Sequence, residues 1–416
     1  MNWRHWMGLT PTEADFARHL LSIAEQAGHT NWRYEAADST LRSGDQVVNL
    51  GNLYLEYSRA SRSGRAGFRE KYRAILAPPK TGQVTALWSV AQTHLYPLLR
   101  SRYERVAIDI QHRGKEPMPA RAAKSFLGNM DIVIGYDHDH TVTQVQASAL
   151  DGWGVTLDTA LDRASANLRA LPPPRWVSVG PALWSLESPG GYPDSFLLLP
   201  KLFNRLAVKG TPLAMIPNRG VLLATGSDEP NGIAALLDAA KQSMQGAPWP
   251  LSPDLYRITP AGPELYAPTD ANAGLLATLQ KIDLAGLYKE QKEALPKYHA
   301  SIQEDVFVAT YALMGKKHRP EEAQSWCTWT QGVHSLLPVT DAIAFVWDLD
   351  KAKRQTAMVS WTEAERLVGH YLKPTGEDPP RFRVDEFPTE AELGELREIA
   401  NRPAAPNDGP TTHTKS

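Results

Sequence analysis

The chain has 416 residues, of which 42% are hydrophobic and 22% charged, as in ordinary globular proteins. Its 44 basic and 46 acidic residues leave a formal net charge of −2, which excludes an overall field that would attract nucleic acid or an anionic membrane. The single cysteine, Cys327, excludes an internal disulfide and any metal site built from several cysteines. Because this length exceeds one typical hydrophobic core, we expect two domains.

The first residues, MNWRHWMGLTPTEAD, contain no apolar stretch followed by a small-residue cleavage site, so we expect no export signal. Apolar runs such as FLLLP and VLLAT are far shorter than the roughly 20 residues that a membrane-spanning helix needs. Together with the lone cysteine, these features predict a cytoplasmic protein that contacts neither membrane nor nucleic acid.

The first half of the chain mixes helices with short apolar strands. Phe16, Leu20 and Ile23 recur at helical spacing, and Gly28 stands where a helix-ending glycine belongs. Extended segments follow in HLYPLLRS, MDIVIGYD and VTQVQASAL. A second clear helix is expected over VTLDTALDRASANLRAL, which the three prolines at 172–174 end.

Two hairpins and a further helix come next. PLAMI and VLLAT flank the turn PNRG, and DLYRIT and PELYAP flank a second turn. Ile233, Leu236 and Met244 lie on one face of the helix between these hairpins. Because helices alternate with antiparallel hairpins rather than with parallel strands, we predict an α+β fold.

The last third begins with a charged helical stretch and then returns to strands in VFVATYALM, WCTWTQGVHSLL and AIAFVW. Ser360 with Glu363, and Thr389 with Glu392, have the spacing of capping boxes and predict two helix starts. We therefore predict an α+β domain over residues 1–268, a helical connector over 269–300, a smaller α+β domain over 301–400 and a disordered tail over 401–416.

Two segments resemble each other. AMIPNRGVLLAT and SLLPVTDAIAFV each contain an apolar run, a proline-led turn and a second apolar run. A duplicated hairpin and a chance similarity explain this pattern equally well.

The stretch TGSDEPNG joins a strand to a helix, which is where phosphate-binding loops occur. It matches neither the Walker pattern nor the dinucleotide fingerprint, and Asp228 and Glu229 would put negative charge where a phosphate should lie. We expect these carboxylates to accept hydrogen bonds from the free helix amides, with Pro230 in the first turn. The stretch is therefore interpreted as a structural joint, and no cofactor is predicted.

Four local patterns carry a resemblance to a known family. They are YEAADSTLRSGDQ after the first helix, HLYPLLRS, ASANLRALP and MIPNRGVLLATGSDEPNGIAAL. In these positions the chain, from about residue 10 to 270, resembles the YtpQ-like family of uncharacterised bacterial proteins, a domain of unknown function. The resemblance implies a cytoplasmic α+β protein and brings no established activity or catalytic residue.

The segment YDHDHTVT offers the most suggestive set of metal ligands. His138 and His140 lie two residues apart and would share one face of an extended strand, next to Asp139. Two imidazoles with a distant carboxylate or His94 could bind zinc or a similar ion. We favour a solvated hairpin turn, since aspartate and histidine tolerate turn geometry and avoid the core, and we predict no metal.

Cys327 is followed by His334 and Asp341, the residue types of a cysteine nucleophile with its base. It stands between Trp326 and Trp329 on an expected strand, where alternation places Cys327 and Trp329 on one face. We therefore interpret Cys327 as a small core residue rather than a nucleophile.

Two basic stretches and several tryptophans complete the candidates. GKKHRPEE at 315–322 and SRASRSGRAGFREKYR at 58–73 are interpreted as solvated surfaces, the second also as a contact to the other domain. Large aromatic residues near element ends could anchor an interface or cover two small cores. These residues are Trp88, Trp153, Trp176, Trp184 and Trp249.

Because every catalytic pattern is incomplete, the sequence favours a non-catalytic protein that works through contacts with a protein partner, as an accessory or regulatory module. The alternative is a metal-dependent enzyme, such as a hydrolase, that uses His138, Asp139 and His140. A small ligand bound between the domains is a third hypothesis.

Overall fold

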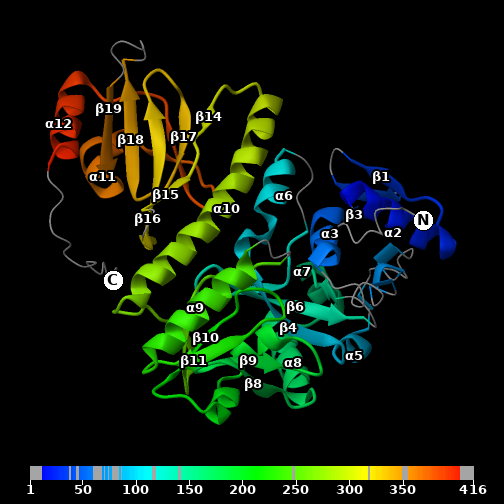
Figure 1. The fold of residues 1–416 in the computed structure, drawn as a ribbon. Coiled ribbons are helices and arrows are strands. Elements are labelled where there is room, and N and C mark those ends of the chain that lie inside the picture. The colour runs from blue at the N-terminus through cyan, green and yellow to red at the C-terminus, as the bar shows by residue number, and fades with distance from the viewer. Residues whose placement is uncertain are drawn as a thin grey trace. The chain divides into compact units, whose positions relative to one another are not determined.

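The computed structural model divides into two compact units (Figure 1). Unit 1 comprises Met1–Glu104 and Met118–Leu279, and unit 2 comprises Arg105–Pro117 and Gln280–Ser416. The structure describes residues 12–36, 39–43, 46–59, 68–69, 71–73, 75–76, 84–85, 87–114, 119–138, 142–245, 249–316, 319–348 and 355–402. The fold is α+β, as the sequence predicts, whereas the assignment of 105–117 to unit 2 has no counterpart in the sequence analysis.

Unit 1 begins with two helices and a small antiparallel sheet. These elements are α2 (Glu13–Gln26), β1 (Arg33–Glu35), β2 (Thr40–Ser43), β3 (Gln46–Asn49) and α3 (Leu50–Arg59). The side chain of Thr12 caps α2 and Asp15 bonds back to the Thr12 amide, so the helix starts with a complete capping box. Phe16, Leu20 and Ile23 are buried together, which confirms the predicted helical face.

The middle of unit 1 is a second antiparallel sheet in which β6 pairs with β4, β5 and β7. Its elements are α5 (Trp88–Ala91), β4 (Leu95–Ser101), β5 (Ala123–Ser125), β6 (Met130–Asp137), β7 (Val142–Gln144), α7 (Ala147–Trp153) and α8 (Leu157–Ala170). The amide of Asn167 on α8 donates to the carbonyl oxygens of Gln92 and Leu95, each at 2.8 Å, and so fixes the helix to the start of β4.

The third sheet of unit 1 has six antiparallel strands in the order β13-β12-β10-β11-β9-β8. Its elements are β8 (Arg175–Gly180), β9 (Leu183–Glu187), the 3-10 helices η2 (Pro193–Leu198) and η3 (Pro200–Arg205), β10 (Pro212–Met215), β11 (Leu223–Gly226), α9 (Pro230–Met244), β12 (Tyr256–Thr259) and β13 (Gly262–Leu265). Along β10, Leu213 and Met215 pack with α9 on one face, while Ala214 packs in a second core on the other.

The joint between β11 and α9 differs from its prediction in one respect. Pro230 is the first helical residue, as expected, but the side chain of Glu229 makes no capping hydrogen bond. The carboxylate of Asp228 instead accepts from the Ser227 hydroxyl at 2.9 Å, and that hydroxyl accepts from the Thr211 amide. The expectation that Asp228 and Glu229 accept from the helix amides is therefore wrong, because Asp228 is engaged in the preceding turn.

Unit 2 is built on two four-stranded sheets and on the part of a long helix, α10 (Asn272–Ser301), that begins at Gln280. One sheet has the order β14-β17-β21-β20 and the other β15-β16-β18-β19. The elements, besides η1 (Arg102–Arg105) at the unit boundary, are α6 (Val106–Gln111), α10 (Asn272–Ser301), β14 (Phe307–Val308), β15 (Ala312–Lys316), β16 (Arg319–Thr330), β17 (Ser335–Pro338), β18 (Ala342–Trp347), β19 (Gln355–Ser360), α11 (Trp361–Val368), η4 (Gly369–Tyr371), β20 (Lys373–Pro374), β21 (Arg381–Val384) and α12 (Glu390–Ala400).

The hypothesis of a duplicated hairpin is wrong. β10 and β11 pair antiparallel with each other, but β17 and β18 lie in different sheets. β17 pairs with β14 and β21, and β18 pairs with β16 in parallel and with β19. A local apolar pattern predicts strands but does not specify their partners.

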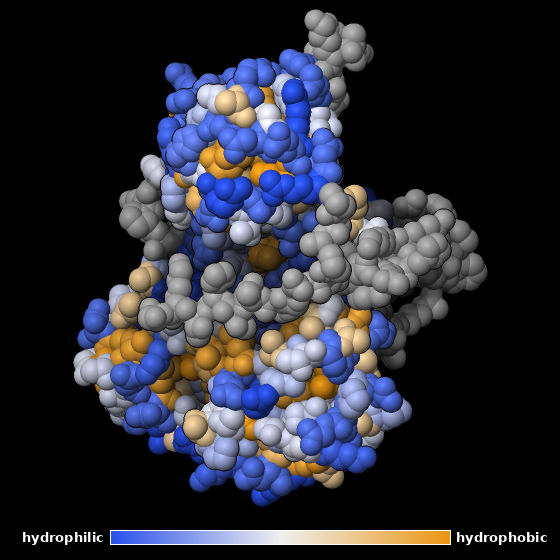
Figure 2. Space-filling view, turned by 90° about the vertical axis from the view of Figure 1, so that its left-hand side faces the viewer, coloured by the Kyte–Doolittle hydropathy of each residue, from blue (hydrophilic) through white to orange (hydrophobic). Residues whose placement is uncertain are grey.

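The two helix starts predicted in unit 2 are both present. Thr389 and Glu392 form a complete capping box at α12. At α11 only half of the predicted box forms, because Ser360 accepts from the Glu363 amide while the Glu363 carboxylate binds Arg366. Glu390, Glu395 and Glu398 on α12 are exposed. The face of unit 2 seen in Figure 2 is mainly hydrophilic. Among the described residues, no helix has both the length and the apolar character needed to cross a bilayer.

A buried arginine joins α10 to the sheet that contains β14. Arg381 on β21 is 1% exposed and donates to the side chain of Gln291 and to the carbonyl oxygens of Tyr288, Ala309 and Leu336. Its guanidinium also lies over the Tyr288 ring, 5.0 Å from the centroid. Burial lowers the pKa of Arg381 to about 10, so the group stays protonated at neutral pH.

Replacing Arg381 with methionine should destabilise unit 2 by about 3–5 kcal/mol, because four buried acceptors each lose a charged donor. Hydrogen exchange measured by mass spectrometry should show faster exchange in residues 288–301 and 381–384. The exposed Arg175, replaced in the same way, serves as the control and should change the free energy of unfolding by less than about 0.5 kcal/mol. Unchanged exchange in the Arg381→Met variant would contradict this role.

Candidate functional site

The predicted metal ligands are only partly within the described residues. Asp139 and His140 lie outside them, so the structure does not test the pair His138 and His140. His138 bonds to the Thr143 hydroxyl at 3.1 Å, and the rings of His94 and His138 both contact Tyr136, with centroids 5.3 and 4.7 Å away. Among the residues that the structure describes, no group of three or more histidines, cysteines or carboxylates could hold a metal.

The structure does not assemble a cysteine nucleophile. Cys327 is 1% exposed in a core with Trp329, on the strand face that the sequence predicts. Thr340 donates to its sulfur at 3.6 Å, and burial raises the pKa of the thiol to about 11. His334 faces Asp385 instead, and Asp341 accepts from Ser325 and Lys281. Cys327 therefore packs as a core residue.

The other candidates have structural explanations where they are described. Trp88 and Trp153 pack against one core, and Trp176 and Trp184 pack against another. These contacts confirm that four of the five tryptophans cover cores, whereas the ring of Trp249 lies under the Arg219 guanidinium. Most of the basic stretch at 58–73 lies outside the described residues. In the other basic stretch, GKKHRPEE, the side chains of residues 316–322 also lie outside them.

Sheet topology brings a different set of polar residues together in unit 2. β14 and β17 run parallel, β21 runs antiparallel to β17, and β20 runs antiparallel to β21. The starts of β14, β17 and β20 and the end of β21 therefore meet at one edge of the sheet. His334 precedes β17, and Lys373 begins β20. Arg383 is the last residue but one of β21, and Asp385 directly follows this strand.

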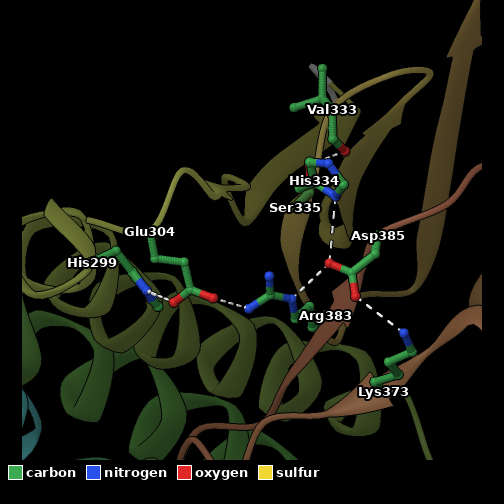
Figure 3. Close-up of polar contacts among 8 residues, drawn as sticks. All are labelled: His299, Glu304, Val333, His334, Ser335, Lys373, Arg383 and Asp385. Carbon is green, nitrogen blue, oxygen red and sulfur yellow. Dashed lines mark hydrogen bonds and ion pairs between the residues drawn. The ribbon is translucent and has the colours of Figure 1, made fainter. Parts of the chain in front are cut away.

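These residues form a chain of alternating charges, which we call the strand-end network (Figure 3). Its members are His299, Glu304, Arg383, Asp385, His334 and Lys373. Arg383 binds Glu304 through Nη1 and donates from Nε to the Asp385 carboxylate at 2.7 Å. Lys373 and His334 approach the same carboxylate at 3.1 and 3.5 Å.

His299 and Glu304 connect this network to the end of α10. The Glu304 amide donates to the His299 carbonyl at 2.9 Å, and the Glu304 carboxylate lies 2.7 Å from Nδ1 of the His299 ring. Because an ionised carboxylate only accepts, Nδ1 carries the proton. Gln303 between them adopts a left-handed conformation, with φ of 57°, which turns the chain back toward the helix.

The charges of the network perturb one another in the expected directions. The Arg383 guanidinium, with a smaller contribution from His299, lowers the pKa of Glu304. Arg383 and then Lys373 lower the pKa of Asp385 against a modest effect of burial. The two carboxylates in turn raise the pKa of Arg383, Glu304 more than Asp385. The charges of Glu304, Asp385 and Arg383 are therefore mutually stabilised near neutral pH.

This arrangement suits a fixed surface better than proton transfer or metal binding. Both oxygens of Glu304 and both oxygens of Asp385 already accept from cations or histidine. Ser335, the neighbouring hydroxyl in Figure 3, is buried and donates to the Val333 carbonyl at 3.2 Å. The network thus holds its side chains in place and leaves its carboxylates little capacity for another ligand.

Large apolar side chains stand at the same edge of the sheet. Ile302, Phe307 and Val333 are 50%, 51% and 37% exposed. The Phe307 amide donates to the His334 carbonyl, so β14 is tied to the turn that carries Val333. Lys292 on α10 lies over the Phe307 ring, with Nζ 5.3 Å from the centroid. Apolar tips next to fixed charges are typical of protein interfaces.

Sequence reasoning missed the strand-end network because its members are distant in the chain. Arg383 and Glu304, for example, are 79 residues apart. One signal was present: RFRV alternates two arginines with two apolar residues, which places both cations on one face of a strand.

No family model matches the chain, and neither the curated proteins nor the solved structures contain a significant match.

Replacing Arg383 with methionine should make the protein more sensitive to acid. Glu304 and Asp385 have lowered pKa values in the folded state, so their contribution is present above the unfolded pKa of about 4 and is lost as pH falls. Without Arg383 both values return toward normal, and the acid-unfolding midpoint should rise by about 0.5 pH unit. Circular dichroism against pH measures this, with Arg175→Met as the control variant. An unchanged midpoint would show that the network does not stabilise the fold.

The metal hypothesis has a separate test. Elemental analysis of protein purified without an affinity tag should find no stoichiometric transition metal if the protein works through protein contacts alone. One ion per chain that disappears in a His138→Ala, His140→Ala double variant would instead establish the metal site.

Proposed function

We propose that the protein is a cytoplasmic accessory or regulatory module that binds another protein through one edge of unit 2. The observation that carries this proposal is the exposure of Ile302, Phe307 and Val333, which lie close in the chain or in the sheet to Glu304 and His334 of the strand-end network. We call these three residues and the network together the strand-end surface. No catalytic step is assigned to it.

The apolar part of this surface supplies the binding energy. Burying a phenylalanine or isoleucine side chain is worth about 1.5–3 kcal/mol relative to leaving it exposed, so half-exposed side chains retain a large share of that gain for a partner. Phe307 also carries an aromatic ring on a short edge strand, where the main chain of β14 is paired on one side only. A partner that covers Phe307 would bury the most apolar area.

The charged part of the surface supplies orientation. Arg383 is held by Glu304 and Asp385, so its side chain loses little further freedom when a partner binds. Mixed charges at the rim of an interface favour partners with the complementary pattern and increase the rate of association. The surface therefore supports binding of a partner with its own apolar centre and mixed rim.

The resemblance to the YtpQ-like family concerns residues of unit 1 and remains a prediction. It brings no activity that would compete with this proposal. The cytoplasmic location likewise rests on the sequence features and on the buried, unpaired thiol of Cys327.

A photo-crosslinking amino acid placed at Phe307 should capture one discrete protein in the cells from which the chain comes. The expected adduct should weaken at least about tenfold when Ile302 is replaced with aspartate, because a buried charge opposes binding by more than 1.4 kcal/mol. Gel shift and mass spectrometry of the adduct measure the outcome.

The matched control places the same crosslinker at Val179, which is 54% exposed in unit 1. Equal capture at Val179, or no discrete adduct at Phe307, would overturn the proposal. Circular dichroism of the Ile302→Asp variant should match that of the unmodified protein, because the side chain is half exposed.

A further inference from the structure

A second group of polar residues lies inside unit 1, where β4 packs against η2. Tyr96 and Arg100 lie four residues apart in β4 and therefore share one face of the strand. The ring of Tyr96 stacks on that of Tyr192, with centroids 4.8 Å apart. Tyr192 has a left-handed backbone, with φ of 59°, and turns the chain into η2. The two residues that follow Pro193, Asp194 and Ser195, are therefore buried in the same region as Arg100.

Three donors in this region have no partner among the described residues. They are Nε of Arg100, the hydroxyl of Ser195 and Nε of Arg219. Arg100 is 8% exposed and Ser195 is 0% exposed. Leaving a buried donor unsatisfied costs about 1–3 kcal/mol, and more for a charged group. Such a concentration of unpaired donors indicates that an acceptor belongs there.

Arg219 is held in place without using all of its donors. Its guanidinium lies over the Trp249 ring, 4.3 Å from the centroid, and Nη2 binds the Glu104 carboxylate. The amide of the next residue, Gly220, donates to Asp194 at 3.0 Å, so Arg219 is anchored beside η2. Arg219 is near enough to Arg100 for their repulsion to add to burial in lowering the pKa of Arg100.

Charges of both signs act on Arg100: Arg219 repels it, whereas Glu104 and Asp194 attract it. Arg219 is paired with Glu104, whereas Arg100 has no carboxylate within ion-pair distance in the described part of unit 1. Nη1 of Arg100 donates to the carbonyl oxygen of its neighbour, Leu99, at 2.7 Å. Burial raises the pKa of Asp194, and Arg100 opposes this effect.

We propose that Arg100, Ser195 and Arg219 form a binding site for the carboxylate of a small molecule. A planar carboxylate matches the two-donor edge of a guanidinium and can also accept from the serine hydroxyl. A phosphate dianion fits less well, because Asp194 and Glu104 lie beside the arginines. The site is independent of the strand-end surface, and its residues all belong to unit 1.

Fluorine NMR with fluoroacetate, a small monocarboxylate, tests this site in the full chain. Its resonance should broaden saturably, and acetate should compete better than inorganic phosphate at equal ionic strength. Ser195→Ala should raise the fluoroacetate Kd by about tenfold, the loss expected for a hydrogen bond to a charged group. Arg100→Gln should abolish binding, and the exposed Arg175→Gln variant should bind normally.

The stability of the variants without ligand shows whether a loss of binding comes from the site itself or from a loss of folding. Ser195→Ala removes an unpaired buried hydroxyl, so the variant should be as stable as the unmodified protein without ligand. A crystal soaked in acetate should show the carboxylate within hydrogen-bond distance of Arg100 and Ser195. Only water at that position, no saturable broadening, or stronger competition by phosphate would overturn the proposal.

Discussion

The buried guanidinium of Arg381 is the contact on which the architecture of unit 2 depends. It joins α10, β17, β21 and the segment after β14 through one side chain. Its neighbours complete the arrangement, because Gln291 donates to the Pro379 carbonyl and the Tyr288 hydroxyl donates to that of Pro380. An apolar residue in this position would pack against α10 but would remove a donor from the carbonyl oxygens of Tyr288, Ala309 and Leu336. The register between helix and sheet follows from this one cation.

That register also places the strand-end network. Arg381 and Arg383 are two residues apart on β21 and therefore project from the same face. Because Arg381 is fixed against Gln291, Arg383 lies two residues further along the same strand face, near the end of α10. There it binds Glu304, whose carboxylate also bonds to His299. The same strand thus supplies a buried structural cation and a partly exposed surface cation. The partly exposed one is the group available to a partner.

Periodicity and end signals predicted the elements that local sequence determines. The faces of α2 and α8, the proline stop after α8 and the capping boxes near Ser360 and Thr389 are all local in the chain. Strand pairing was less predictable, since β17 and β18 have the pattern of a hairpin but join different sheets. The hydrogen bonds of the joint at Asp228 and Glu229 were also not predictable from the local pattern, because the Asp228 carboxylate accepts from the Ser227 hydroxyl. The sites were hardest to find: charged residues far apart in sequence look like ordinary solvated surface until topology brings them together.

The composition of unit 2 also determines when it can form during synthesis. Residues 105–117 belong to it, but the remainder begins only at residue 280, after most of unit 1. β21, which carries Arg381, leaves the ribosome later still, and β14 and β17 cannot be closed into their sheet without it. Residues 105–117 are therefore made long before the rest of the unit to which they belong. A growing chain has a complete first unit well before it has a second, and the interval exposes it to chaperones and proteases.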